Sequence, residues 1–278
     1  MLPCSCGVRI NICYDKINSV QAPDDVLKKT QKDELIEIKQ AIFFRPRIHE
    51  EEMHIFDDIL TTLDREVIRR GGYGKTRGLG EHPVLMIIDP QYNYTGADRP
   101  VLDQIHEWPS GVGESSWRAI ERIKDLLTVS RHKNIPIIYT RQIQTNIEFD
   151  GFAAKTDREQ SQYLKGAKGT MIVDELAPER GDLVIDKSYS SAFYGTPLLS
   201  FLIKLRADTL IVTGGTSSGC IRATCVDAVT RNFNVAVVED CIYDRISVSH
   251  KAALLDLWMK YCDVITSDEA IGYLESIQ

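Results

Sequence analysis

The chain carries a thiol, Cys220, at the end of the glycine-rich segment 213–220, TGGTSSGC. The largely apolar residues 209–212 before this segment are typical of a buried strand, and the apolar spacing over 221–229 predicts a helix after it. Cys220 is therefore expected in the first turn of a helix, where unpaired backbone N–H groups and the helix dipole favour an anion. Such a position favours a lowered thiol pKa and supplies donors for an oxyanion. A buried cysteine beside a tight turn is the structural alternative.

Charged residues follow three other apolar runs. Asp89 ends the first of these runs, Lys187 follows another, and Asp244 and Arg245 lie shortly after a third. Ligands of parallel sheets bind beyond the carboxyl ends of the strands, so these side chains and Cys220 are expected at one edge of one sheet. A carboxylate near the thiol can accept its proton, and an ammonium group can stabilise the resulting charges. The pattern predicts a nucleophilic cysteine assisted by an acid and a lysine.

A serine nucleophile is the alternative that the same segment allows. Residues 215–219, GTSSG, match the G-x-S-x-G motif of α/β-hydrolases and lie between a predicted strand and a predicted helix, as that motif requires. Ser217 would then be the nucleophile, with Asp244 and His250 completing a triad. However, His250 falls at or within a predicted helix, and no HGGG-type oxyanion segment lies upstream. The cysteine interpretation is favoured for these reasons.

Strands and helices alternate from residue 83 onward, and this alternation predicts the scaffold. The strand runs are nearly continuous in Val, Ile and Leu, as expected for strands buried on both faces. The pattern predicts a Rossmann-like, three-layer α/β fold, with helices on both faces of a doubly wound, mainly parallel six-stranded sheet. The predicted strands are 84–88, 136–139, 183–185, 210–212, 235–238 and 264–265. The predicted helices are about 114–133, 196–205, 219–231 and 249–260.

The polar residues 1–82 are predicted to form a helical N-terminal extension and connector, and residues 83–278 the α/β domain. Residues 74–76, GKT, resemble the end of a phosphate-binding loop. Arg69, however, stands where that motif requires its first glycine, and no helix clearly follows. A flexible connector is therefore the better interpretation of this glycine-rich stretch. Two helices are expected in the extension, near 24–42 and 50–70.

The composition bounds the class of protein and its partners. The chain has 278 residues, 43% of them hydrophobic and 26% charged, which excludes a fully disordered chain. The net charge of -7 and the lack of a strong basic cluster argue against nucleic-acid binding. The seven cysteines have no regular spacing, so a disulfide framework is not expected. With no long apolar run and no evident signal peptide, the sequence favours a cytoplasmic protein without a membrane span.

Asp89, Lys187 and Cys220, in this order at predicted strand ends, resemble the isochorismatase-like cysteine hydrolases. Within that family the chain is most similar to the branch of N-carbamoylsarcosine amidase and maleamate amidohydrolase. The similarity covers about residues 70–278, and residues 1–70 have no counterpart in it. The SAFYGT and SGCIRAT stretches are its most specific parts. The matching segments are VLMIID at 84–89, DKSYSSAFYGT at 186–196, TGGTSSGCIRAT at 213–224 and VEDCIYDR at 238–245.

The resemblance implies a role for each of these residues. Cys220 would attack a carbonyl carbon bonded to an amide or ureido nitrogen, and Asp89 would accept the thiol proton and deliver it to the leaving nitrogen. Lys187 would hold the carboxylate and the thiolate in place. The family has a non-proline cis peptide before the cysteine, here Gly215–Thr216, which would turn the Thr216 N–H toward the Cys220 N–H as a pair of oxyanion donors. Ammonia would leave, and water would hydrolyse the remaining thioester.

Arg245 is the residue that the resemblance connects with substrate choice. Its position is similar to that of an arginine that clamps the substrate carboxylate, as suits a bidentate guanidinium. A surface salt bridge with Asp244 is the structural alternative. The metal-binding nicotinamidase branch carries histidines after its second strand, whereas residues 140–144 read TRQIQ, so neither a metal nor another cofactor is expected. Cys220 argues against isochorismate chemistry, because true isochorismatases generally lack that cysteine.

Three functional hypotheses remain. The favoured one is a cysteine-dependent amidohydrolase that cleaves a C–N bond of a small carboxylate-bearing amide or ureide, similar to N-carbamoylsarcosine, through a thioester. A maleamate or ureidoacrylate amidohydrolase is its closest variant. The second is a serine hydrolase that uses Ser217, and the third is a silent family member that acts as a binding protein. Retention of the three reactive residues argues against the third. The resemblance also implies a homo-oligomer, either a dimer or a tetramer.

Overall fold

A computed structural model describes residues 54–146, 150 and 160–277, all of which belong to one compact unit, Glu51–Gln278. The helix predicted near 24–42 and the first residues of the helix predicted at 50–70 lie outside the described residues. The division of the chain into an extension and an α/β domain after residue 82 stays a prediction.

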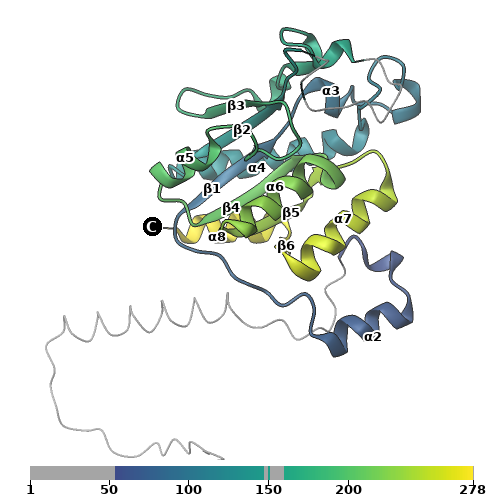
Figure 1. Ribbon diagram of the computed structural model, residues 1–278, viewed down its shortest axis with the longest axis vertical. Coiled ribbons are helices and arrows are strands. Elements are labelled where there is room, and N and C mark those ends of the chain that lie inside the picture. Colours follow the sequence, from purple (N-terminus) through teal and green to yellow (C-terminus); the bar gives the residue numbers. More distant parts are fainter. Residues whose placement is uncertain (1–53, 147–149, 151–159, 278) are drawn as a thin grey trace, which may run out of the picture. The chain divides into compact units, whose positions relative to one another are not determined.

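The centre of the fold is one six-stranded parallel sheet (Figure 1). Its strands are β1 (Pro83–Ile88), β2 (Ile137–Gln142), β3 (Leu183–Lys187), β4 (Thr209–Gly215), β5 (Asn234–Tyr243) and β6 (Asp263–Ile265). Their order across the sheet is β3-β2-β1-β4-β5-β6, and every neighbouring pair is parallel. The chain builds one half of the sheet outward from β1 and then returns to the middle to build the other half from β4. Ligands of such sheets bind at this reversal, beyond the carboxyl ends of the strands.

Helices cover both faces of the sheet, so the predicted doubly wound, three-layer fold is confirmed (Figure 1). All of β1 is buried, with Val84, Met86 and Ile88 in one core and Leu85 and Ile87 in the other, as the alternation of side chains along a strand requires. The first core is covered by α5 (Leu198–Lys204), α6 (Arg222–Thr230) and α7 (Ser247–Lys260). The second core is covered by α4 (Glu114–His132) and α8 (Ser267–Ser276).

Two helices that follow β4 in the chain differ from the sequence-based prediction. Helix α8 is not predicted, although Thr266 and Glu269 form a capping box at its start, a recognisable signal. The Glu269 N–H donates to Thr266 Oγ1 at 3.3 Å, and the Thr266 N–H donates to the Glu269 carboxylate at 2.8 Å. The helix predicted at 219–231 divides into a π-helical turn, Ser217–Ile221, and α6.

No helix of the described residues is long and apolar enough to span a bilayer.

The part of the chain before β1 contains one α-helix within the described residues. The prediction of a helix at 50–70 corresponds to α2 (Thr62–Gly71), which follows a single 3-10 turn at Asp57–Ile59. The chain then enters β1 without a further helix. Residues 74–76 therefore lack the helix on which a phosphate-binding loop depends. A four-residue helix, α3 (Tyr92–Thr95), follows β1.

Several contacts attach the connector between α2 and β1 to the domain. Gly74 lies so close to α7 that an added Cβ would stand 2.1 Å from the Trp258 ring. Farther along, the N–H groups of Arg77 and Gly78 donate to the Asp263 carboxylate, each at 2.9 Å. The glycine-rich composition of this stretch therefore serves close packing as well as the turn itself.

We expect Gly74→Ala to destabilise the protein more than Gly72→Ala. Both glycines have a left-handed φ, +74° and +69°, so alanine costs about 1–2 kcal/mol at either position. Only at Gly74 does the new Cβ also meet a ring, and such overpacking adds about 1–3 kcal/mol. Urea unfolding followed by circular dichroism gives both free energies of unfolding. Equal losses would show that the connector does not pack against Trp258.

Candidate active site

Cys220 lies in the π-helical turn that follows β4, and only 3% of its surface is exposed. The chain reaches this turn through Gly214, whose φ is +98° and whose added Cβ would stand 2.2 Å from the Ile88 carbonyl oxygen, so only glycine fits. One residue farther on, the peptide bond between Gly215 and Thr216 is cis. The close approach of β4 to the end of β1 brings the turn that carries Cys220 beside the residue that follows β1.

Asp89, Lys187 and Cys220, which the sequence places at three strand ends, are in mutual contact. Lys187 Nζ lies 2.8 Å from Asp89 Oδ2 and 3.2 Å from Cys220 Sγ. The side chains of Asp89 and Lys187 have no exposed surface. Since β2 separates β3 from β1, the lysine side chain spans the end of β2 to reach the other two groups. Lys187 Nζ also donates to the Tyr189 carbonyl oxygen at 3.1 Å.

The conformation of Asp89 aims its carboxylate at Lys187. Its φ is +46°, a value that few residues other than glycine adopt. The Asp89 N–H donates to the carbonyl oxygen and to Oγ1 of Thr140, at 3.2 and 3.1 Å. In return, Thr140 Oγ1 donates to Asp89 Oδ1 at 2.6 Å. One carboxylate oxygen is thus held by Thr140, and the other faces Lys187. Thr140 is not recognisable from the sequence, because a threonine within a strand has no chemical signature.

Burial and the neighbouring charges keep the Cys220 thiol protonated. Burial raises its pKa, the Lys187 charge lowers it, and the Asp89 carboxylate raises it again, with a net pKa of about 12. Burial lowers the pKa of Lys187, but the Asp89 carboxylate and the hydrogen bonds of the ammonium to Asp89 and Cys220 outweigh burial and raise that pKa above its usual value. The expectation of a lowered thiol pKa is therefore wrong, because burial and the Asp89 carboxylate outweigh the effect of the Lys187 charge.

This arrangement can move the thiol proton without changing the net charge of the buried cluster. Transfer from Cys220 Sγ to Asp89 converts a thiol and a carboxylate into a thiolate and a carboxylic acid. The Lys187 ammonium contacts both groups and stabilises whichever of them carries the negative charge. Ionisation of the thiol to solvent would instead leave an extra charge in a buried place, which is costly. Asp89 is therefore placed to act as a general base and then as a general acid.

Gln142, the last residue of β2, also belongs to the cluster. Its Oε1 accepts a hydrogen bond from Tyr94 Oη at 3.0 Å and lies 3.5 Å from both Lys187 Nζ and Cys220 Sγ. The Gln142 N–H donates to Gln91 Oε1 at 2.6 Å, and Gln91 Nε2 donates to the Gln142 carbonyl oxygen at 3.2 Å. Neither glutamine is recognisable from the sequence, because a neutral amide at or just after a strand end carries no signal of chemistry.

Thr216 and Cys220, whose N–H groups are the candidate oxyanion donors, belong to one hydrogen-bonded turn. The Thr216 carbonyl oxygen accepts from the N–H groups of Gly219 and Ile221, at 3.0 and 3.2 Å. Thr216 and Cys220 are both buried. The backbone on either side of the thiol is therefore held in one arrangement before any substrate arrives, as oxyanion stabilisation requires.

Arg245, just beyond β5, is held by a backbone carbonyl rather than by a close ion pair. Its Nε and Nη2 donate to the Ser110 carbonyl oxygen at 3.0 and 2.7 Å, whereas Nη1 lies 3.9 Å from Asp244 Oδ1. Tyr243, two residues before Arg245, lies beside the cluster, since its Oη is 3.5 Å from the Asp89 carbonyl oxygen. The end of β5 therefore brings Arg245 to the same edge of the sheet as Asp89.

Ser217, Asp244 and His250 are also brought together, in an order that does not suit a serine nucleophile. Ser217 Oγ donates to Asp244 Oδ2 at 3.1 Å and lies 2.8 Å from His250 Nδ1, so the serine stands between the acid and the histidine. A serine hydrolase needs the histidine between the other two, where it can take the serine proton. Asp244 also accepts from the Ser218 N–H at 2.9 Å, so this carboxylate caps the turn that carries Cys220.

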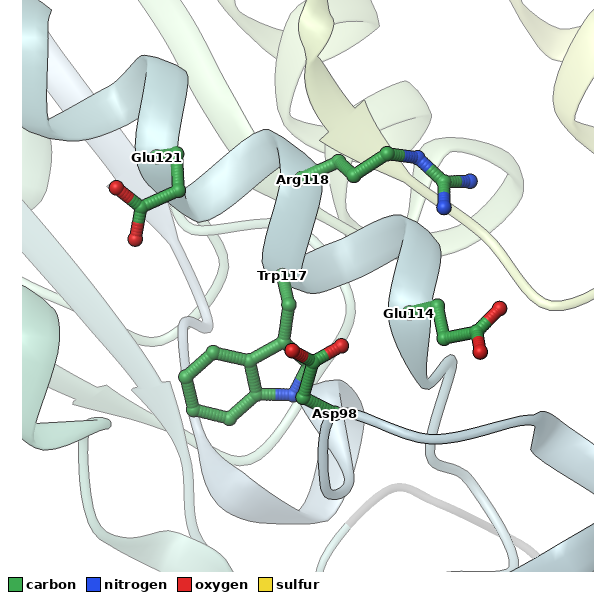
Figure 2. A pocket seen from close by; sticks show the side chains of 5 residues that line it. All are labelled: Asp98, Glu114, Trp117, Arg118 and Glu121. Carbon is green, nitrogen blue, oxygen red and sulfur yellow. The ribbon is translucent and has the colours of Figure 1, made fainter.

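Two surface hollows, of about 360 and 430 Å³, lie beside α4 and not at the cluster. Figure 2 shows Trp117, Arg118 and Glu121 projecting from α4 into the smaller one, which Asp98 also lines. Neither hollow is lined by Asp89, Lys187 or Cys220. Across residues 54–146, 150 and 160–277, no group of three or more His, Cys, Asp or Glu side chains is arranged as a metal site.

A parallel α/β sheet that holds a buried thiol, carboxylate and ammonium in contact at its switch point is the architecture of a cysteine hydrolase. Residues 83–269 match the Isochorismatase domain, and the chain belongs to that family of hydrolases. The family predicted from the sequence is thereby confirmed, and the protein is an enzyme.

Individual relatives agree with this assignment. The chain is 30% identical over 210 residues to maleamate amidohydrolase of Pseudomonas putida, which covers 75% of this chain and 94% of the relative. It is 30% identical over 214 residues to N-carbamoylsarcosine amidase of an Arthrobacter species, which covers 74% of this chain and 76% of the relative. An isochorismatase family protein from Desulfovibrio vulgaris superposes with a TM-score of 0.61 at 25% identity, covering 70% of this chain and 100% of the other.

We expect Asp89→Asn to lower the pKa of Cys220 and yet to slow turnover at least about a hundredfold. Without the carboxylate, a thiolate becomes the nearest counter-charge for Lys187, so the thiol ionises at a lower pH. The group that accepts and returns the proton is lost at the same time, and general acid–base catalysis contributes about 10²–10⁴ in rate.

The thiolate absorbance in the ultraviolet, titrated against pH, measures this pKa. The same titration of a protein that also carries Cys220→Ser isolates the signal of Cys220 from those of the other cysteines. A folded Asp89→Asn protein with nearly normal turnover would remove Asp89 from the mechanism.

Proposed function

We propose that this protein is a cysteine-dependent amidohydrolase that cleaves a C–N bond of a small carboxylate-bearing amide or ureide and releases ammonia. The observation that carries the proposal is the contact of Lys187 Nζ with both Asp89 Oδ2 and Cys220 Sγ, at 2.8 and 3.2 Å. The relatives named for maleamate and N-carbamoylsarcosine support a substrate that combines an amide or ureido group with a carboxylate.

In the first half of the reaction, Cys220 Sγ attacks the substrate carbonyl carbon while the thiol proton passes to Asp89. The N–H groups of Thr216 and Cys220 donate to the oxygen that becomes negatively charged. When the tetrahedral intermediate collapses, the C–N bond breaks and Asp89 returns its proton to the leaving nitrogen. Ammonia departs, and a thioester, or a thiocarbamate from a ureide, remains on Cys220.

In the second half, water attacks the same carbonyl carbon and Asp89 accepts one of its protons. The C–S bond breaks, and Asp89 passes this proton to the sulfur. The products are a free thiol and a carboxylic acid, or a carbamic acid from a ureide. Lys187 remains an ammonium throughout, so the cluster begins and ends each cycle in the same charge state.

Arg245 is proposed to bind the substrate carboxylate. The Ser110 carbonyl fixes its guanidinium without neutralising it, since a carbonyl oxygen carries no net charge. The nearest carboxylate, Asp244, lies 3.9 Å from Nη1 and is engaged by the Ser218 N–H. A positive charge held in place at this edge of the sheet suits an anionic group of the substrate. A cytoplasmic location and a homo-oligomer stay predictions.

We expect Cys220→Ser and Cys220→Ala to abolish ammonia release, because the hydroxyl is a poorer nucleophile at this site and alanine has none. The assay uses maleamate, N-carbamoylsarcosine and ureidoacrylate as substrates. Ser217→Ala is the matched control one turn away, and it should keep most of the activity. An inactive Ser217→Ala protein together with an active Cys220→Ala protein would favour the serine hydrolase alternative.

We expect Arg245→Ala to raise the Michaelis constant for acid substrates at least tenfold, because the loss of a charge-assisted pair in a closed site costs about 1.5–3 kcal/mol. Neutral amides of the same size should be poor substrates of the wild type, and the substitution should change their Michaelis constants little. Steady-state ammonia release on paired acid and neutral amides measures both effects. A wild type that prefers nicotinamide over every carboxylated amide or ureide would contradict this role.

A further inference from the structure

Gln142 holds a hydrogen-bond donor that the protein leaves unpaired. The residue is fully buried, and its Nε2 finds no acceptor among the described residues. Its Oε1, bonded to the same carbon atom, lies 3.5 Å from Cys220 Sγ, so the unpaired donor stands beside the nucleophile. Buried polar groups in proteins are nearly always paired. An unpaired donor in a reactive cluster therefore points to a ligand that completes it.

The neighbours of Gln142 determine which end of its amide faces the cluster. Lys187 Nζ, 3.5 Å from Oε1, can only donate, and Tyr94 Oη donates to the same oxygen at 3.0 Å. Turning the amide over would place its N–H groups against an ammonium. Nε2 therefore presents two N–H groups, and its missing partner must be an acceptor.

We propose that Gln142 binds the substrate, with Nε2 donating to a carbonyl or carboxylate oxygen. This inference deepens the proposed function and rests on it. The NH₂ group of a substrate amide is excluded as the partner, because a planar amide nitrogen donates and does not accept. Gln142 would thus select for the oxygen of the substrate and hold it beside Cys220 Sγ.

Gln142 and Arg245 are tied to the same set of contacts. Tyr94, which donates to Gln142, packs edge-on against Tyr163 with their ring centroids 5.9 Å apart. Tyr163 Oη lies 2.5 Å from Ser110 Oγ, and the Ser110 carbonyl oxygen accepts from Arg245. One connected group of side chains therefore positions both donors that we assign to the substrate. This arrangement suits two donors that act on one small molecule.

Calorimetric binding of maleamate to the Cys220→Ser protein tests the inference without turnover. In this background, Gln142→Met keeps the approximate size and removes the amide, whereas Gln142→Glu keeps an acceptor for Tyr94 and removes the donors. We expect both variants to bind maleamate at least about tenfold more weakly. Ser217→Ala is the control, because it removes a buried hydroxyl from the turn that carries Cys220 and leaves the Gln142 amide and its partners in place; we expect a loss below about threefold.

The neutral diamide maleamide distinguishes the two kinds of oxygen. If the Gln142 variants lose affinity for maleamate alone, the partner of Nε2 is the carboxylate. If they lose equal affinity for both compounds, the partner is the carbonyl oxygen. Unchanged affinity in correctly folded Gln142→Met and Gln142→Glu proteins would overturn the inference.

Alkylation of Cys220 separates this inference from the substrate class. Iodoacetamide and iodoacetate offer a carbonyl and a carboxylate oxygen to the same thiol, and neither needs turnover. We expect Gln142→Met in the otherwise wild-type protein to slow at least one of them by about threefold or more, and Ser217→Ala to slow neither. If Gln142→Met slows alkylation but the wild-type protein hydrolyses no amide, the proposed function is contradicted and Gln142 remains a ligand-binding residue. Unchanged rates with both reagents would overturn the inference itself.

Discussion

The buried ion pair between Asp89 and Lys187 is the constraint on which the rest of the site depends. Neither side chain has exposed surface, and removing one partner of such a pair typically costs about 3–5 kcal/mol, because the other charge is left uncompensated. Each charge has a second partner, Thr140 for the carboxylate and the Tyr189 carbonyl for the ammonium. These contacts require the parallel register of β1, β2 and β3, so the sheet and the ion pair support one another.

The ion pair also determines how Cys220 reacts. A carboxylate and an ammonium in contact cancel one another, so the thiol beside them has no net positive charge to lower its pKa, and burial raises it to about 12. The resting cysteine is therefore a thiol, and attack must be coupled to proton transfer to Asp89. The same ammonium also orients the Gln142 amide, because an ammonium can only donate and therefore faces the amide oxygen. A single buried charge thus arranges the base, the nucleophile and the donor that we assign to the substrate.

Much of this could be predicted from the sequence, because the scaffold and the reactive groups follow regular patterns. Continuous apolar runs identify strands that are buried on both faces, and Asp89, Lys187 and Cys220 each follow such a run. Thr140 and Gln142 could not be predicted in this way, because their roles depend on strand register and their side chains are common at many positions. The thiol pKa was predicted in the wrong direction, since the helix start is visible in the sequence and the burial is not. Helix α8 had a usable signal in its capping box.

The protonation state of resting Cys220 is the most direct test of this account. Infrared difference spectroscopy between the wild-type and Cys220→Ser proteins isolates the S–H stretching band of this cysteine from those of the others. A resting thiol predicts a clear S–H band near pH 7 that persists well above the usual cysteine pKa of about 8.5 and is lost when the thioester forms. Absence of the band near pH 7 would mean a resting thiolate, which would contradict proton transfer from Cys220 to Asp89 as the step that couples this ion pair to catalysis.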